Sequence, residues 1–142
     1  METVKCSVNI NASPAKVWAA LWDKDNYTRW TLVFGEGNTA ISDWQEGSKI
    51  QFVAKDGGGM YGIIEKKVIN EQIIFKHLGE IKEGKEITSD WEGVREKYFL
   101  INEGGTTTLK VEMDSNEEYA DYFKSTFPTA LAAIKEIAEN IL

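Results

Sequence analysis

The sequence predicts an α+β fold in which a curved antiparallel sheet of about seven strands wraps round one long C-terminal helix. Segments of alternating apolar and polar residues are separated by short turns of the kind that joins antiparallel strands. Only the last segment has an apolar stripe long enough for a helix that covers a sheet. Because a sheet must bury its apolar face, the helix is expected to lie on it.

The first strand is expected at residues 3–11. Here Val4, Cys6, Val8 and Ile10 alternate with polar residues, the period of a strand with one buried face. We interpret Cys6 as a small apolar residue that packs on this strand.

Two short helices are expected to follow strand one. Ser13 is placed to cap the first helix, and Pro14 suits its first turn, where no intrahelical N–H bond is lost. The second is expected within residues 23–30, because Tyr27 and Trp30 are three residues apart and can share one face.

Six further strands are expected between residues 40 and 114. Gly- and Asn-containing turns separate them, including residues 56–59 and 103–105, and such turns suit antiparallel hairpins. The expected ranges are 40–45, 49–55, 59–69, 72–78, 90–102 and 106–114.

The final helix is expected from an apolar stripe with intervals of three and four residues. Pro128 lacks a backbone donor, so the helix either begins at this residue or bends there. On the first alternative, residues 117–124 form a separate piece. The stripe comprises Phe123, Phe127, Ala130, Leu131, Ile134, Ile137, Ala138 and Ile141.

The overall composition predicts one domain spanning residues 1–142, since no repeat or linker divides the chain. The formal net charge of −7 argues against a nucleic-acid or anionic-membrane partner. No apolar stretch has the length of a signal peptide or a membrane span. Cys6 is the only cysteine, which excludes an internal disulfide, so we expect a cytoplasmic protein.

The single histidine, His77, limits the enzyme classes that the sequence can represent. It excludes a zinc site built on two histidines, and no Gly-x-Ser-x-Gly nucleophile motif is present. The glycines at 57–59 lack the Lys-Ser/Thr of a phosphate-binding loop and are interpreted as a turn. We therefore assign no catalytic residue and expect no cofactor and no metal.

The register of two neighbouring strands predicts an inward carboxylate. If Leu109, Val111 and Met113 face the core, a hairpin over residues 103–105 places Glu96 and Tyr98 inward as well. An inward carboxylate in an apolar pocket is a candidate functional group. The alternative is a register slipped by one residue, or a position of Glu96 at a wet rim.

Aromatic residues supply further candidates for a ligand-binding wall. Phe75 and His77 share one face of their strand, and Phe52 shares a face of another strand with Ile50 and Ala54. Trp30 and Trp44 are expected nearest an opening, because they lie in the irregular region and the strand that follows it. Aromatic rings serve equally well as core, so each assignment competes with a packing role.

The motifs, taken in order along the chain, resemble the START-like (SRPBCC) superfamily, in the branch of the activators of the 90 kDa heat-shock protein ATPase. Each is weak alone, and their shared order carries the resemblance, which runs nearly end to end. They are Ile10-x-Ala12-x-Pro14-x-x-Val17-Trp18, Trp30, Trp44-x-x-Gly47-Ser48, Gly62, Phe75-x-His77-x-Gly79, Trp91-x-Gly93-x-x-Glu96-x-Tyr98, Gly105-Thr106 before Leu109, and Phe127-Pro128-x-Ala130-Leu131.

The resemblance implies a helix-grip fold with a cavity between the sheet and the C-terminal helix. Across the superfamily this cavity takes lipids, hormones and polyketide-like molecules. The superfamily also contains cyclases and hydroxylase subunits, but no residue of theirs transfers to this chain. The eukaryotic chaperone activator has a separate N-terminal chaperone-binding domain, for which this chain has no room.

Three functional hypotheses follow. The first is a binding module for a small apolar or amphipathic molecule, with Phe52, Phe75, His77, Glu96 and Tyr98 as wall residues. The second is an interaction module with a chaperone or another protein partner. The third is an enzyme of the cyclase kind that uses His77 or Glu96 as acid or base. The sequence defines no oligomeric state.

Overall fold

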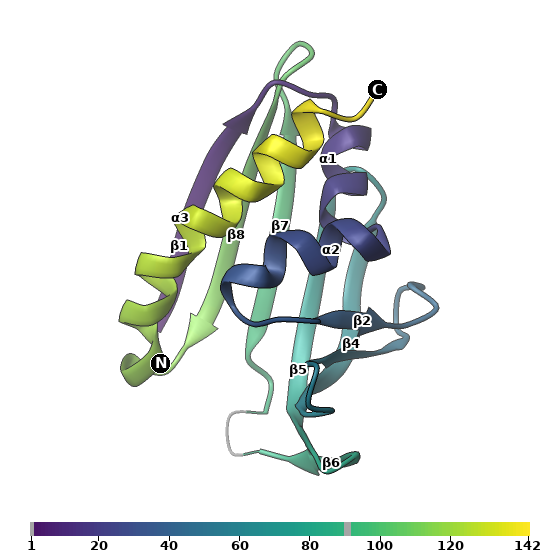
Figure 1. Ribbon diagram of the computed structural model, residues 1–142, viewed down its shortest axis with the longest axis vertical. Helices are drawn as coiled ribbons and strands as arrows, with labels where there is room; N and C mark the ends of the chain where they lie inside the picture. Colours follow the sequence, from purple (N-terminus) through teal and green to yellow (C-terminus); the bar gives the residue numbers. More distant parts are fainter. Residues whose placement is uncertain (1, 90–91) are drawn as a thin grey trace.

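The computed structural model describes residues 2–89 and 92–142. Within them the chain forms an eight-stranded antiparallel sheet with helices on one face (Figure 1). The strands are β1 (Glu2–Ile10), β2 (Thr39–Ile41), β3 (Lys49–Val53), β4 (Gly59–Val68), β5 (Gln72–Lys82), β6 (Lys85–Thr88), β7 (Arg95–Asn102) and β8 (Thr107–Ser115). The helices are α1 (Pro14–Trp22), α2 (Lys24–Trp30), the 3-10 helix η1 (Thr31–Val33) and α3 (Glu117–Glu139).

The strand order is β1-β8-β7-β5-β4-β3-β2, and β6 pairs with β5 beside this path. The predicted α+β architecture is confirmed, with corrections to single strands. The sequence did not predict β6, because its four residues are all exposed and show no alternating apolar pattern. Strand β5 extends to Lys82 rather than residue 78, and β2 ends at Ile41 rather than residue 45. The strand expected at 90–102 begins at Arg95, and residues 90 and 91 lie outside the described residues.

Helix α3 is continuous from Glu117 to Glu139, with Pro128 inside it. The structure thereby rules out a helix that begins at Pro128 and a separate piece at 117–124. Asn116 caps the helix by accepting a hydrogen bond from the Tyr119 backbone N–H at 3.0 Å. Pro128 is exposed, so water can satisfy the carbonyl that it leaves without an N–H partner.

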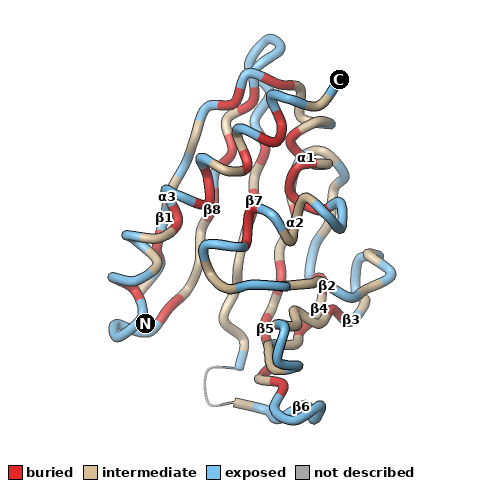
Figure 2. Tube along the Cα trace, in the orientation of Figure 1, coloured by how far each residue is buried: buried red, intermediate tan, exposed pale blue. Residues whose placement is uncertain are grey.

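The helices form one layer over the sheet, as Figure 1 shows. Helix α3 packs on β1 and β8, while α1 lies beside α3 and contacts β7 and β8. Burial alternates along β5, where every second residue from Ile73 to Ile81 is buried (Figure 2). The core lies between this sheet face and the apolar stripe of α3, which includes Phe127, Leu131 and Ile134.

Two side-chain hydrogen bonds fix the short helices. Ser13 caps α1 as predicted and accepts from the Lys16 N–H at 3.4 Å. The indole N–H of Trp30 donates to the Leu21 carbonyl at 2.8 Å, which fastens α2 to the end of α1.

None of the helices in residues 2–89 and 92–142 combines the length and apolar character that a membrane crossing needs.

Candidate functional site

A cavity of about 640 Å³ lies between the first turns of α3, helices α2 and η1, and the inner face of the sheet. Aromatic side chains supply a large part of its wall. Tyr27 and Trp30 come from α2, Phe52 from β3 and Tyr98 from β7. A pocket of this size with an aromatic lining is typical of a small-molecule site.

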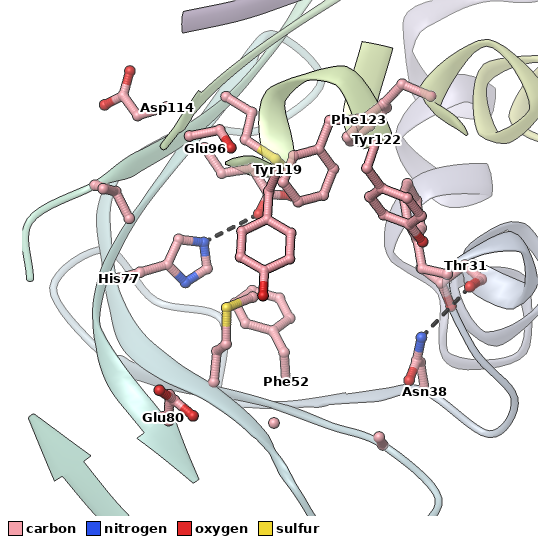
Figure 3. A pocket seen from close by; sticks show the side chains of 18 of the residues that line it. Thr31, Asn38, Phe52, His77, Glu80, Glu96, Asp114, Tyr119, Tyr122 and Phe123 are labelled. Atoms are coloured by element: carbon pink, nitrogen blue, oxygen red, sulfur yellow. Dashed lines mark hydrogen bonds and ion pairs between the residues drawn. The ribbon is translucent and has the colours of Figure 1, made fainter. Parts of the chain in front are cut away.

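Three polar side chains meet on one wall of the cavity. Glu96 and Tyr98 point to the same side of β7 because they are two residues apart, and the Tyr98 hydroxyl donates a hydrogen bond to the Glu96 carboxylate. His77 lies on the neighbouring strand β5, where Phe75 pairs with Glu96. Its Nε2 atom is 3.1 Å from Glu96 Oε1, the interaction drawn in Figure 3.

The Glu96 contact orients the His77 ring. A carboxylate only accepts hydrogen bonds, so the Nε2–H of His77 donates a hydrogen bond to Glu96. In the neutral imidazole, Nδ1 is then an acceptor. The His77 residue is 4% exposed, and within the described residues its buried Nδ1 has no hydrogen-bond partner. A buried unpaired acceptor in a cavity wall is a position that a ligand donor can fill.

The tyrosine hydroxyls near Glu96 stay protonated. Burial raises the pKa of Tyr98 well above its usual range, and the adjacent Glu96 charge raises it further. Burial, with a smaller effect of Glu96, also raises the pKa of Tyr27. Both phenols therefore stay neutral at the polar end of the cavity, and the single O–H of Tyr98 is already donated to Glu96.

An irregularity in the β4–β5 pairing brings a second acidic residue to the cavity. The register shifts between Tyr61 and Gly62, so that Gly62 pairs with His77 while Met60 pairs with Glu80. His77 and Glu80 consequently both line the cavity although they are three residues apart. A Cβ on Gly62 would come within 2.2 Å of the Lys76 carbonyl oxygen, which explains the glycine at this close approach.

The structure brings five of the predicted wall residues to the cavity. They are Trp30, Phe52, His77, Glu96 and Tyr98. The inward register that placed Glu96 and Tyr98 on one face is observed, because Glu96 pairs with Met113 and Tyr98 with Val111. Their role in ligand binding stays a prediction.

The other two predicted wall residues, Phe75 and Trp44, are not among the residues that line the cavity. Phe75 is fully buried, because the rings of Trp22 and Phe52 pack against it at centroid distances of 5.3 and 5.2 Å. Trp44 adopts a left-handed backbone with φ of 63° and packs against Trp22 at 5.7 Å. It lines a separate hollow of about 350 Å³ between α2 and β2.

Sequence reasoning missed the contribution of α3 to the wall. Tyr119, Tyr122 and Phe123 line the cavity from its first turns (Figure 3), and Phe34 joins them from the end of η1. Tyr119 and Tyr122 are half exposed, so they lie outside the buried stripe that identified the helix. The sequence did contain a signal for this contribution. The aromatic residues between 119 and 127 are more numerous than one buried helix face needs.

Metal ligation finds no support in the part of the chain that the structure describes. There, no three His, Cys, Asp or Glu side chains are grouped so that they could hold an ion.

Comparison with known families decides the identity of the fold. The model of the family described as "Activator of Hsp90 ATPase homolog 1-like protein" matches residues 11–139. The chain belongs to this family. The match confirms the resemblance that the motifs predicted. None of the curated proteins compared with this member of the family matches it significantly.

Solved structures agree with the family assignment. The solution structure of the Aha1 dimer from Colwellia psychrerythraea is 20% identical, with a TM-score of 0.76 over 99% of this chain and 98% of that one. Protein MLL2253 from Mesorhizobium loti is 15% identical, with a TM-score of 0.76 over 99% and 100%. CalU16 from Micromonospora echinospora is 19% identical, with a TM-score of 0.69 over 97% and 76%. These likenesses establish the helix-grip fold of this family member.

Proposed function

We propose that this protein binds a small apolar or amphipathic molecule in the cavity between the sheet and α3. The observation that carries the proposal is the contrast between an aromatic wall and one polar cluster, His77, Glu96 and Tyr98. Ligand pockets of this design bury an apolar body and orient it by a few polar groups. The unpartnered Nδ1 of His77 supplies one such group.

The entrance of the proposed site lies between η1 and the start of α3. Tyr119 and Tyr122 line the cavity and yet are 53% and 45% exposed, so they belong to its open side. Leu32 and Val33 of η1 are also exposed, next to Phe34, which lines the cavity. An apolar molecule therefore meets an apolar rim before it reaches the polar cluster.

The test is binding of N-phenyl-1-naphthylamine, a neutral aromatic probe whose fluorescence rises in apolar surroundings. Met113 lines the cavity from β8, so Met113→Trp fills part of it and is expected to weaken binding at least about tenfold. Glu112→Trp is the matched control, because Glu112 pairs with Lys5 and Lys97 on the opposite sheet face. Saturable binding that is lost in Met113→Trp and kept in Glu112→Trp supports the proposal; equal affinity in both variants contradicts it.

A second candidate function is interaction with a chaperone of the Hsp90 kind, supported by the family description and by the exposed apolar rim. Its test is the ATPase rate of a purified Hsp90-type chaperone with and without this protein. On this hypothesis Leu32→Asp abolishes stimulation, because it places a charge on the rim, while Met113→Trp leaves it intact. The reverse pattern favours the internal site.

The hypothesis of a cyclase-like enzyme stays a prediction. The His77–Glu96 pair has the geometry of an oriented base, since Glu96 holds Nε2 and leaves Nδ1 open. Turnover of a bound ligand that disappears in a folded His77→Gln variant would establish it.

A further inference from the structure

We propose that the cavity selects a cationic ligand, an apolar body that carries a protonated amine held at Glu96. This inference rests on the proposed binding function and names the chemical class of the ligand. It follows from the distribution of charge in the wall, from the partners of each carboxylate and from the rings around Glu96.

The charged side chains of the cavity wall have one sign. Glu80, Glu96 and Asp114 line the cavity, and the described lining residues include no Lys or Arg. The formal net charge of −7 adds to this local field. Sites that take carboxylates or phosphates depend on Arg, Lys or a helix N-terminus. The helix N-terminus at this wall, that of α3, carries Glu117 and Glu118 in its first turn, so the wall opposes an anionic head group.

Two of the three carboxylates already have partners outside the cavity. Asp114 accepts hydrogen bonds from the Thr3 hydroxyl at 3.0 Å and from the Arg95 backbone N–H at 3.1 Å. The Glu80 carboxylate lies 3.6 Å from Lys82 Nζ, and the Glu80 side chain is 40% exposed to solvent. Neither group needs a ligand cation.

Glu96 differs from both. Its side chain is 13% exposed, and its hydrogen-bond partners in the described residues are the Tyr98 hydroxyl and His77 Nε2. Both are neutral donors while His77 is neutral. Within the described residues, no Lys or Arg forms an ion pair with the buried Glu96 carboxylate. A buried carboxylate without a cation is costly, and a ligand ammonium group would offset that cost.

Aromatic rings around Glu96 favour a cation over a neutral polar group. The Tyr98 hydroxyl bonds the carboxylate, and the Phe52 ring centroid is 5.5 Å from that of His77. The pKa of Tyr27 is raised by burial and, to a smaller extent, by the Glu96 charge. Ring faces attract ammonium groups. The N–H bonds of a primary ammonium can also meet the open acceptor at His77 Nδ1.

The experiment compares three probes with one skeleton, 4-phenylbutylamine, 4-phenylbutanol and 4-phenylbutyrate, by isothermal titration calorimetry at pH 8. We expect the amine to bind at least about tenfold more tightly than the alcohol and the anion to bind more weakly than both. Glu96→Gln is expected to remove the preference for the amine, because it lowers the affinity for the amine far more than the affinity for the alcohol. Affinity for the alcohol also reports that the cavity of the variant is intact.

Glu112→Gln is the matched control, since it removes the same charge from the outer face of the sheet. It is expected to preserve the preference for the amine. Equal binding of amine and alcohol, or a preference that survives Glu96→Gln, overturns the cationic class, while alcohol binding that Met113→Trp abolishes still supports the proposed function. If none of the three probes binds, both proposals fail.

Discussion

The imidazole of His77 and the carboxylate of Glu96 come from neighbouring strands, β5 and β7, and meet at 3.1 Å inside the cavity. The pairing of Phe75 with Glu96 sets this geometry, because it places His77 diagonally opposite Glu96 on the same sheet face. With Tyr98 on its other oxygen, Glu96 is held by two donors that leave one acceptor, His77 Nδ1, free for a ligand.

Removing the Tyr98 hydroxyl is expected to destabilise the fold through Glu96. In Tyr98→Phe the largely buried carboxylate loses one of its two donors, and the free energy of unfolding should fall by about 1–3 kcal/mol. The measurement is urea unfolding at pH 7. The same substitution in a Glu96→Gln background should cost less, because no charge is then left underpaired. An equal loss of unfolding free energy in both backgrounds would show that the effect of Tyr98→Phe does not act through Glu96.

Alkaline pH is expected to weaken the fold through the buried phenols. The folded pKa values of Tyr27 and Tyr98 are raised by burial, whereas in the unfolded chain tyrosine ionises near its reference value of 10.0. The stabilisation is complete below pH 10 and is lost above it, because the unfolded state then binds fewer protons than the folded state. Each phenol contributes a slope that approaches about 1.4 kcal/mol per pH unit.

Unfolding free energies measured from pH 8 to pH 11 test this expectation. Tyr98→Phe should show a shallower decline than the unchanged protein across that interval. An identical decline would mean that the Tyr98 phenol ionises at the same pH whether the chain is folded or not.

Cys6 is expected to react slowly with thiol reagents. Burial raises its pKa from 9.0 to about 11, and the thiolate is the reactive species. At pH 8 the thiolate population is then about one hundredth of that in the unfolded chain, since each unit changes it tenfold. Reaction with 5,5′-dithiobis(2-nitrobenzoic acid), compared in native buffer and in denaturant, measures the ratio. Similar rates under both conditions would contradict it.

Pro128→Ala is expected to stabilise the protein. Proline in a helix interior removes a hydrogen bond and crowds the preceding turn, and Pro128 is exposed, so its ring buries little area. The free energy of unfolding should rise by about 1–3 kcal/mol in chemical denaturation. Thr129→Ala, at the next exposed position, is the control and should change stability by less than about 0.5 kcal/mol. A loss of stability in Pro128→Ala would show that the proline shapes α3 in a way the fold requires.

Part of the candidate site could be predicted because side chains in a strand alternate between two faces. That rule placed Glu96 and Tyr98 together from their spacing alone, and the pairing of β7 with β8 agrees with it. The same rule failed for Phe75, which faces inward but is covered by Trp22 and Phe52. An inward side chain belongs to the packed core when other side chains cover it, and to a cavity wall when none does. The sequence of a single strand does not encode which side chains lie opposite.

The sequence by itself determined the order of the elements other than η1 and β6, the inward face of most strands and the amphipathic character of α3. These follow from local periodicity and turn chemistry, which act over a few residues. Only the tertiary structure decided that the β4–β5 irregularity brings Glu80 to the cavity, that Tyr119 and Tyr122 form its rim and that Trp44 turns away from it. Those outcomes depend on contacts between residues far apart in the chain, where packing and strand pairing override local pattern.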